Sequence, residues 1–393
     1  MPNSAVLHWI EDELQRLVER NQYRTQRIRE SPHVSGLVQV DGRTLIDFSS
    51  NDYLGLSANS TLVDAVHSCV SQMGFGSGAS PLITGYGVWH RRLEQELARF
   101  EDAEAALVFG SGYAANIAVI TALVGPGDCI FSDELNHASI IDGCRLSGAK
   151  IEVYRHNDLV HLREMIAAAG QFRRTLIATD SLFSMDGDFA RLPELVQIAE
   201  SANAMLMIDE AHATGVFGER GKGVAELMEV AEKILIRVGT LSKALGGIGG
   251  FVVGPQVLID WVRNKARSYI FSTAMPEIAA AVGLAALQLV EQEPQRRITL
   301  LEKSKWLREE LGRNGIATGN SESQIIPIIV GSSGDALRAS SELAESGFLV
   351  PAIRPPSVPE NSSRLRLSVT SGHSEEQLSD VVLELARIIR ILS

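Results

Sequence analysis

The sequence predicts an α/β fold: a large domain with a mostly parallel seven-stranded sheet flanked by helices, and then a smaller C-terminal α+β domain. From about residue 50, short continuous apolar runs alternate with helical stretches. Such runs are typical of parallel strands that are covered on both faces. After about residue 275, long helical stretches replace this alternation. We therefore expect an N-terminal helix and hairpin segment at 1–48, a large domain at 49–280 and a small domain at 281–393.

The N-terminal segment is expected to contain a helix over residues 5–30 and then a hairpin. The hairpin strands are Val38–Val40 and Leu45–Phe48, on either side of an Asp41–Gly42 turn. The large domain is expected to contribute seven strands, at Ala105–Phe109, Asp128–Phe131, Ile151–Tyr154, Thr175–Asp180, Met205–Asp209, Ile234–Gly239 and Gly250–Val253.

Residues 276–313 are expected to form long helices, and a last helix is expected over 374–391. Between them lie three further apolar runs, expected as strands at Ile325–Val330, Phe348–Val350 and Leu365–Val369. Ligands in open α/β sheets gather at the carboxyl ends of the strands. Polar residues that directly follow the large domain's strands are therefore the first candidates for a functional site.

Composition excludes several classes of function. The formal charge of −12 argues against a nucleic-acid partner, because little on the chain would neutralise a phosphate backbone. The odd number of cysteines, three in a chain of this length, indicates that there is no disulfide framework. They include no CxxC pair, so neither a zinc ribbon nor a redox motif is expected, and no metal site is expected. The N-terminus lacks the basic start and apolar run of a signal peptide, and no apolar stretch is long enough to span a membrane. We expect a cytoplasmic protein without membrane contact.

The strongest chemical candidate is Lys243, in the glycine-rich stretch Gly239–Gly250. It follows an expected strand, and glycine allows a cofactor or another backbone segment to approach closely. A lysine held in such a place can be desolvated and can act as a nucleophilic amine. Taken alone, however, a lysine in a loop is most often solvated. The neighbouring motifs therefore decide its interpretation.

A second candidate pair is Asp209 and His212, just after an apolar strand. A carboxylate at a strand end can pair with a protonated pyridine nitrogen, or it can cap the next helix. The spelling Asp-Glu-Ala-His is also that of a helicase box, which requires a phosphate loop of the form GxxxxGK followed by Ser or Thr. The nearest string, at 215–223, has Val216 and Gly223 at two required positions. A helicase is therefore excluded.

A third candidate is the turn at Gly110–Asn116, between an expected strand and an expected helix. Backbone N–H groups at a helix start bind anions such as phosphate. The same residues fit GxGxxA, a dinucleotide-binding fingerprint, with Asp133 near the end of the next strand. From this motif alone, a nicotinamide or flavin enzyme is an open alternative.

Four further residues could contact a cofactor or a substrate. His137, after the strand that ends near Phe131, can stack on a planar ring or move protons. Ser184 can offer a hydroxyl group to a cofactor oxygen. Arg364 and Arg366 alternate along an expected strand and so share a face. Arginine is well shaped to bind a carboxylate at two points.

In combination and order, these motifs resemble those of the α-oxoamine synthases, a family of fold-type I pyridoxal phosphate enzymes, over about residues 20–390. The strings that carry the resemblance are Ser49–Leu56, Asp209–Gly215 and Gly239–Lys243. The resemblance implies that pyridoxal phosphate is the cofactor and that Lys243 holds it as a Schiff base. It also implies that Asp209 keeps the ring nitrogen protonated.

The same resemblance implies roles for other residues. The catalytic residues would be Lys243, His137 and Asp209. Ser272 and Thr273 would reach the phosphate bound by a neighbouring subunit, which implies a homodimer with shared active sites. The other cofactor contacts would be Gly112, Tyr113, Ser184, His212 and Thr240, and the substrate contacts would be Arg27, Asn51, His137, Ser357 and Arg366.

Two strings, at 269–276 and 352–359, resemble the family member of biotin biosynthesis that condenses L-alanine with a pimeloyl thioester and releases carbon dioxide and the free thiol carrier. Coenzyme A and an acyl carrier protein both remain open as the carrier. Sister synthases that use glycine or serine are alternatives; a non-catalytic subunit is another, which the presence of Lys243 opposes. Pro81 stands where many relatives have arginine, and Ser357 where members often have threonine.

Overall fold

The computed structural model of the chain describes residues 4–392, which form two compact units. The large unit consists of Asn51–Ser184 and Asp188–Thr299, and the small unit consists of Met185–Gly187 and the described residues of Met1–Ser50 and Leu300–Ser393. The N-terminal segment expected at 1–48 therefore shares a unit with C-terminal residues. The structural reason is a parallel pairing of strands β2 (Arg43–Asp47) and β11 (Phe348–Leu349).

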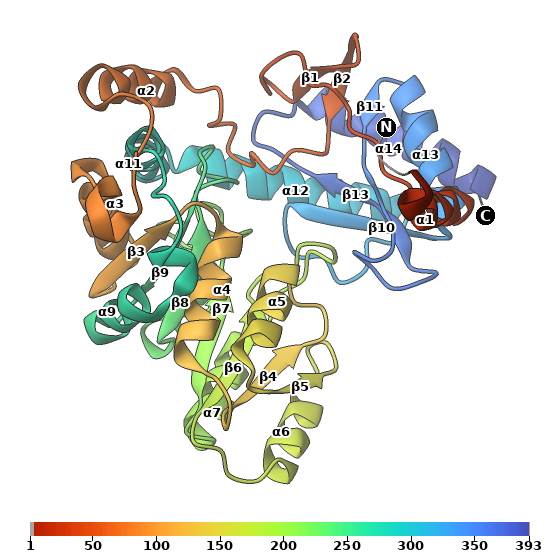
Figure 1. Cartoon of the computed structure of the whole chain (residues 1–393). Coiled ribbons are helices and arrows are strands. Elements are labelled where there is room, and N and C mark those ends of the chain that lie inside the picture. The colour runs from red at the N-terminus through yellow and green to blue at the C-terminus, as the bar shows by residue number, and fades with distance from the viewer. Residues whose placement is uncertain (1–3, 393) are drawn as a thin grey trace. The chain divides into compact units, whose positions relative to one another are not determined.

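The large unit is built on one seven-stranded sheet (Figure 1). Its strands, in spatial order, are β3 (Ala105–Phe109), β9 (Gly250–Gly254), β8 (Ile236–Thr240), β7 (Met205–Asp209), β6 (Thr175–Asp180), β4 (Cys129–Asp133) and β5 (Lys150–Tyr154). β9 is antiparallel to both of its neighbours, and the other four pairs are parallel. The predicted seven-stranded, mostly parallel sheet is confirmed, with strand ends within two residues of those expected.

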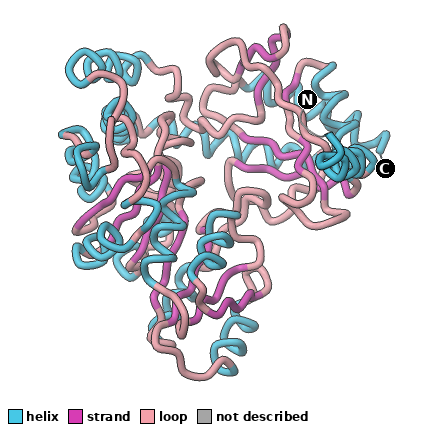
Figure 2. Tube along the Cα trace, viewed as in Figure 1, coloured by secondary structure: helices cyan, strands magenta, loops and turns pink. Residues whose placement is uncertain are grey.

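Helices alternate with the strands along the large unit and are drawn in cyan in Figure 2. They are α2 (Ser60–Met73), η2 (Pro81–Gly85), α3 (Val88–Phe100), α4 (Gly112–Leu123), α5 (Ala138–Ser147), α6 (Leu159–Ala168), α7 (Leu192–Ser201), α8 (Val224–Leu227), η3 (Ala231–Lys233), α9 (Gln256–Lys265), α10 (Arg267–Ile270) and α11 (Glu277–Gln292). α12 (Gln295–Arg313) contributes residues to both units.

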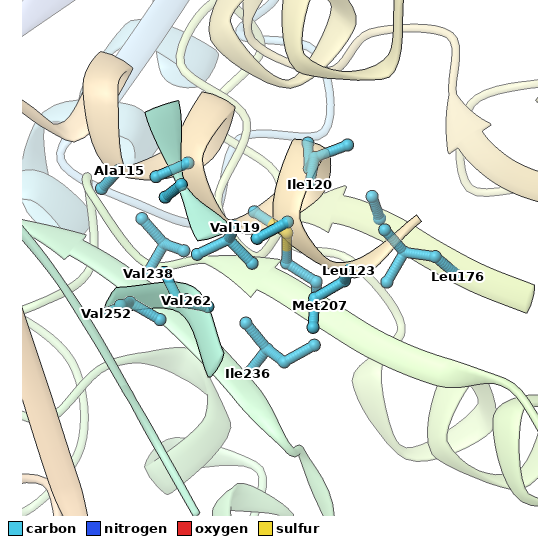
Figure 3. Packing of buried hydrophobic residues seen from close by; sticks show 14 of the residues in the cluster. Ala115, Val119, Ile120, Leu123, Leu176, Met207, Ile236, Val238, Val252 and Val262 are labelled. Carbon is cyan, nitrogen blue, oxygen red and sulfur yellow. The ribbon is translucent and has the colours of Figure 1, made fainter. Parts of the chain in front are cut away.

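The core of the large unit explains why its strands read as continuous apolar runs. Successive strand residues point to opposite faces, so a strand that is covered on both faces needs apolar residues throughout. On one face Leu176, Met207 and Val238 pack with Val119 and Leu123 of α4 (Figure 3). A strand with polar residues at alternate positions could not fill this position in the sheet. The burial of every residue of β3, β4 and β8 agrees with this reading.

The small unit contains two three-stranded sheets. β1 (Leu37–Val40) pairs with β2 as the predicted hairpin, and β2 pairs with β11. The second sheet has the order β10 (Ile325–Gly331), β13 (Ser363–Ser368), β12 (Ala352–Ile353), and all of its pairs are antiparallel. The remaining helices of the unit are η1 (Ser4–Leu7), α1 (His8–Glu19), α13 (Ser333–Glu345) and α14 (Glu375–Leu392).

The helix expected over residues 5–30 is wrong at its C-terminal end, because α1 stops at Glu19. Asn21 adopts a left-handed conformation with φ of 55°, which ends the helix, and the Arg-rich residues that follow are not helical. Strand β12 was also absent from the expected strands, since it consists of only two paired residues. Within residues 4–392, no helix is long and apolar enough to cross a membrane.

Candidate active site

The strands of the large unit deliver most of the predicted site residues to one edge of the sheet. β4, β6, β7 and β8 run in the same direction, so their carboxyl ends lie at the same edge. The end of β3 lies there too, because β9 is antiparallel to both β3 and β8. The predicted residues that follow these strand ends are Gly112, Tyr113, His137, Ser184, Asp209, His212, Thr240 and Lys243.

The start of α4 forms a candidate anion site at this edge. Ser111 caps the helix, since its Oγ accepts a hydrogen bond from Ala114 N at 3.1 Å. Gly112 and Tyr113 are the first two helical residues, and N–H groups at these positions have no acceptor within the helix. Thr240 lies beside them, because a Cβ placed on Gly112 would be 3.6 Å from Thr240 Oγ1. The three predicted phosphate contacts therefore lie at one helix start.

Glycine is required where β9 meets the start of α4. A Cβ placed on Gly250 would lie only 2.4 Å from Gly112 N, which is closer than atoms that are not bonded can approach. Gly249 adopts a φ of 129°, a conformation that side chains disfavour. The glycines after Lys243 thus let that loop return directly against the candidate anion site.

Lys243 follows β8 in a tight loop and is half-buried. Its carbonyl oxygen accepts a hydrogen bond from Gly246 N at 2.8 Å, and Gly247 N donates to Leu241 O at 2.8 Å. A Cβ placed on Gly246 would lie 2.5 Å from Ser57 N, so this turn also needs glycine. The loop therefore holds Lys243 at the carboxyl edge rather than on a freely solvated surface.

Asp209 ends β7 and is buried, with both carboxylate oxygens bonded. Oδ1 accepts from Ala211 N at 2.8 Å, and Oδ2 accepts from Asn116 Nδ2 at 2.6 Å. Asn116 Nδ2 also donates to Ser139 Oγ at 2.8 Å, and Ser139 Oγ lies 2.7 Å from His137 Nδ1. The structure thus links Asp209 and His137 through two residues that were not among the predicted site residues.

His137 is held at both its backbone and its ring. It is the N-cap of α5, and its N–H donates to Asp180 Oδ2 at 2.6 Å. Burial lowers the pKa of its imidazole, Asp209 opposes this shift, and the positive charge of Lys243 adds to it. The ring of Tyr113 lies edge-on to the imidazole, with centroids 6.4 Å apart. His137 is therefore neutral at physiological pH and lies within electrostatic range of Asp209 and Lys243.

Asp180 is a buried site residue that the sequence reasoning missed. It ends β6 directly opposite Asp209 in the parallel ladder. Burial raises the pKa of Asp180 well above its ordinary value, and the charge of Asp209 raises it further. Its position at the end of an expected strand is the one signal that the sequence carries, because the sheet order that places it beside Asp209 comes from the structure.

A second network connects His212 to Asn51. His212 Nδ1 lies 2.7 Å from Tyr53 Oη. Tyr53 Oη donates a hydrogen bond to Asn51 Oδ1 at 3.2 Å. Tyr53 is fully buried. The structure therefore brings together two predicted residues, Asn51 and His212, and adds Tyr53 as the group that joins them.

Three predicted residues of the large unit, Ser184, Ser272 and Thr273, lie in loops. Ser184 is half-buried, four residues after the end of β6. Ser272 and Thr273 are exposed in the segment between α10 and α11, and Ser272 Oγ donates to Thr273 O at 3.1 Å. Exposure leaves these two residues accessible to a second subunit. Their predicted contact across a dimer stays a prediction.

Three predicted substrate contacts belong to the small unit. Arg366, on β13, is 5% exposed, and its Nη1 donates to Ser368 Oγ at 2.8 Å. Arg364 is equally buried, but its Nη1 is paired with Asp186 Oδ1 at 2.6 Å. The strand face that carries both arginines is therefore buried and not solvated. Ser357 is exposed, after the cis Pro355–Pro356 bond.

Arg27 lines a cavity of about 530 Å³ within the small unit. Three further arginines, Arg24, Arg29 and Arg354, share this lining, and we call the site the arginine cavity. Arg24 Nη2 donates to Pro355 O at 2.9 Å, and Arg354 Nη1 donates to the backbone. Throughout residues 4–392, no carboxylate forms an ion pair within 4.0 Å with any of the four guanidinium groups. The cavity is suited to an anionic ligand.

The dinucleotide interpretation of Gly110–Ala115 with Asp133 is wrong. It requires the strands before and after the fingerprint helix to be near neighbours. Here β3 and β4 are the first and sixth strands of the sheet. Five strand spacings separate them by about 24 Å. In addition, Asp133 Oδ1 is already bonded to His156 Nδ1, at 3.0 Å. In the described part of the chain, no cluster of His, Cys, Asp or Glu is arranged to hold a metal ion.

Comparison with known proteins identifies the family of the chain. A family model for class I and II aminotransferases matches residues 43–385. The 8-amino-7-oxononanoate synthase of Chromobacterium violaceum is 48% identical over 370 residues, which are 94% of this chain and 95% of that protein. The chain belongs to the 8-amino-7-oxononanoate synthase family. The same-named protein of Symbiobacterium thermophilum is 42% identical over 389 residues, 99% of each chain.

The fold of this synthase family extends to a sister enzyme. The structure of a serine palmitoyltransferase from S. paucimobilis, with a bound PLP–myriocin aldimine, matches with a TM-score of 0.93. It covers 100% of this chain and 99% of that chain at 27% identity. The resemblance to fold-type I pyridoxal phosphate enzymes that the motifs indicated is therefore confirmed. The roles of individual residues within the family remain proposals.

Proposed function

We propose that the chain condenses L-alanine with a pimeloyl thioester to form 8-amino-7-oxononanoate, carbon dioxide and the free thiol carrier, in biotin biosynthesis. The observation that carries this proposal is the convergence of Lys243, Asp209 and His137 at one edge of the sheet, beside a helix start that can bind phosphate. The identity of the chain to named synthases over nearly its full length supports it.

The residues at this edge fit pyridoxal phosphate. The N–H groups of Gly112 and Tyr113, with the hydroxyl group of Thr240, are suited to its phosphate. The buried carboxylate of Asp209 is suited to its protonated ring nitrogen, and the amine of Lys243 to its aldehyde carbon. Ser184 and His212 would contact the ring oxygen. When it is bound, the cofactor supplies an electron sink that stabilises a carbanion at the α-carbon of the amino acid.

The residues of the chain would then divide the proton chemistry between them. Asp209, held by Asn116 Nδ2 and Ala211 N, keeps its negative charge beside the ring nitrogen and so retains a proton there. Lys243 Nζ takes the α-proton of alanine and returns a proton to the product. His137 stays neutral, so its ring can stack on the cofactor and assist at the carbonyl group of the acyl donor.

The small unit would contribute the groups that recognise anions. The guanidinium group of Arg366 would bind the carboxylate of alanine, and Asn51 and Ser357 would contact substrate. Arg27, in the arginine cavity, would bind the acyl donor, which is anionic whether its carrier is coenzyme A or a carrier protein. A homodimer, with Ser272 and Thr273 reaching the partner's phosphate, and a cytoplasmic location complete the proposal.

One assay tests the substrate assignment. The purified protein, loaded with pyridoxal phosphate, is incubated with pimeloyl-CoA or with a pimeloyl carrier protein, and with alanine, glycine or serine. Mass spectrometry of the product identifies the amino acid that was used. We expect alanine to give the highest kcat/KM with either carrier, and the ratio between the two carriers decides which one the arginine cavity serves.

Other outcomes of this assay would reject parts of the proposal. Higher kcat/KM with serine or glycine would make the chain a sister synthase and would leave the cofactor site intact. A protein that binds no pyridoxal phosphate would reject the site itself. Size-exclusion chromatography with light scattering tests the homodimer separately, because a monomer that is fully active would contradict shared active sites.

A further inference from the structure

Three neighbouring strands of the large unit each end in a buried aspartate. Asp133 ends β4, Asp180 ends β6 and Asp209 ends β7, and these strands are adjacent and parallel in this order. The exposed fractions of the three side chains are 2%, 4% and 4%. Three negative charges in such a row would repel one another strongly in a medium of low dielectric constant.

The two outer aspartates have groups that stabilise a negative charge. Asp133 is 3.0 Å from His156 Nδ1 and also accepts the N–H groups of Leu135 and Asn157. His156 is cationic, because its bonds to two carboxylates outweigh burial and raise its pKa to about 10. Asp209 accepts two hydrogen bonds, as described above, and is the group expected to meet the positively charged cofactor ring.

Within residues 4–392, no lysine, arginine or histidine side chain forms an ion pair within 4.0 Å with the central aspartate, Asp180. Its Oδ2 accepts a hydrogen bond from the main-chain N–H of His137 at 2.6 Å. The charges that act on Asp180 are those of Asp209, which raises its pKa, of Lys243, which lowers it, and of Asp133, which raises it least. Tyr154 of β5 is also affected, since Asp180 raises the pKa of Tyr154 in part. Of the two outer aspartates, Asp209 is the direct partner of Asp180 in the ladder, so its negative charge acts most strongly on Asp180.

We propose that Asp180 is a positioning residue that works as a neutral carboxylic acid, holding His137 by its main-chain N–H while Asp209 carries the negative charge. The hydrogen bond fixes the first residue of α5, and the link from His137 through Ser139 and Asn116 to Asp209 depends on that position. The raised pKa of Asp180, due first to burial and then to Asp209, supports this state. A charged Asp180 would compete with Asp209 for the proton on the ring nitrogen.

The inference predicts an unusual difference between two similar substitutions. Asparagine has the shape of a protonated aspartate and keeps an oxygen acceptor and a donor. Asp180→Asn should therefore keep kcat and cofactor affinity within about threefold of the wild type. Asp209→Asn removes the charge itself and should lower kcat by about a hundredfold or more. Asp180→Leu removes the acceptor for His137 N–H and should lower kcat at least about tenfold.

The experiment compares wild type, Asp180→Asn, Asp180→Leu and Asp209→Asn as enzymes loaded with pyridoxal phosphate. Each is measured for cofactor affinity by fluorescence titration and for the pH profile of kcat. Infrared spectroscopy with isotope-labelled aspartate then reports directly on protonation, because a carboxylic acid and a carboxylate absorb at different frequencies. We expect a carboxylic acid band in the wild type at pH 7.5 that is lost in Asp180→Asn and kept in Asp209→Asn.

Two results would overturn the inference. One is the absence of the carboxylic acid band from the wild type, and the other is a loss of activity in Asp180→Asn as large as that in Asp209→Asn. The role assigned to His137 rests on the proposed function, but the infrared band does not depend on any substrate. A protein with the band and without synthase activity would reject the proposed function and keep Asp180 as a neutral acid.

Discussion

Two histidines, His156 in the large unit and His373 in the small unit, have pKa values that are shifted in opposite directions. In the large unit, His156 lies between Asp133 and Asp188, at 3.0 Å and 2.9 Å, and its pKa is raised to about 10. In the small unit, His373 stacks on Phe48 with ring centroids 4.3 Å apart, and burial lowers its pKa to about 4. One histidine is therefore a permanent cation at physiological pH and the other is permanently neutral.

The difference teaches that partners, rather than burial alone, decide the charge state. His373 Nε2 bonds to the carbonyl oxygen of Asp47, and its Nδ1 accepts from Thr370 N, so two backbone dipoles suit the neutral ring. Two carboxylates suit only the cation. The large unit thus pairs buried carboxylates with a cationic histidine at the edge of the sheet that carries the proposed cofactor site. The small unit instead offers guanidinium groups for anions.

The largest expected effect concerns Lys243, at the carboxyl edge of the sheet in the large unit. Lys243→Ala removes the amine that would hold the cofactor and move the α-proton, so kcat should fall by about a thousandfold or more. Steady-state kinetics measures this, with Lys265→Ala as the matched control, because Lys265 is exposed on α9. Activity within tenfold of the wild type in Lys243→Ala would remove Lys243 from the mechanism.

The second largest expected effect is on stability, and it concerns the cationic His156. His156→Gln leaves two buried carboxylates without a cation and should lower the free energy of unfolding by about 3 kcal/mol at pH 7. Because the folded pKa is raised, the stabilisation by His156 is fully present below its ordinary pKa of about 6.5 and is lost as the pH rises through about 10. Urea unfolding at pH 7 and pH 9.5 should show this slope in the wild type only. An equal slope in the variant would contradict the assignment.

The neutral His373 should make stability depend on pH less strongly than His156 does, and in the opposite direction. The folded pKa of His373 is depressed, so its contribution is present above pH 6.5 and is lost as the pH falls towards 4. Protonation should cost the wild type about 2 kcal/mol of unfolding free energy between pH 7.5 and pH 5. His373→Gln, which does not titrate in this range, should lack that part of the slope. Urea unfolding at the two pH values measures the difference between the proteins.

The smallest expected effect concerns substrate recognition by the small unit. Arg366→Lys keeps the charge but loses the planar two-point geometry, so KM for alanine should rise about tenfold while kcat changes less. Initial-rate kinetics separates KM from kcat, and the KM for the pimeloyl thioester is the internal control. A KM increase confined to the thioester would move Arg366 from the amino acid to the acyl donor.

The fold was largely predictable because the continuous apolar runs of the strands differ clearly from the helical pattern in this chain. The continuous apolar runs of β3, β6 and β7 were predicted residue for residue, since full burial on both faces leaves no other pattern. The strand-end residues Asp209 and Lys243 followed from the same reading. The end of α1 was harder to predict, because the left-handed Asn21 that ends this helix carries no apolar signal.

The missed parts of the site depend on contacts between distant segments. Asn116 meets Asp209 and Tyr53 meets His212 across 93 and 159 residues of chain. No local pattern encodes which strand-end residue will find which helix residue. Asp180 was missed for another reason, because its significance comes from lying between two other aspartates in the sheet order, which the sequence order does not reveal.

The contact of Gly250 with Gly112 N also limits which substitutions the protein can accept in evolution. Position 250 cannot hold a residue larger than glycine while α4 keeps its place. A substitution there would therefore require the whole helix to shift. New specificities must therefore arise from segments that surround the site and not from this junction. In a library built for altered use of the acyl donor, Gly250 should stay fixed while positions of the arginine cavity are varied.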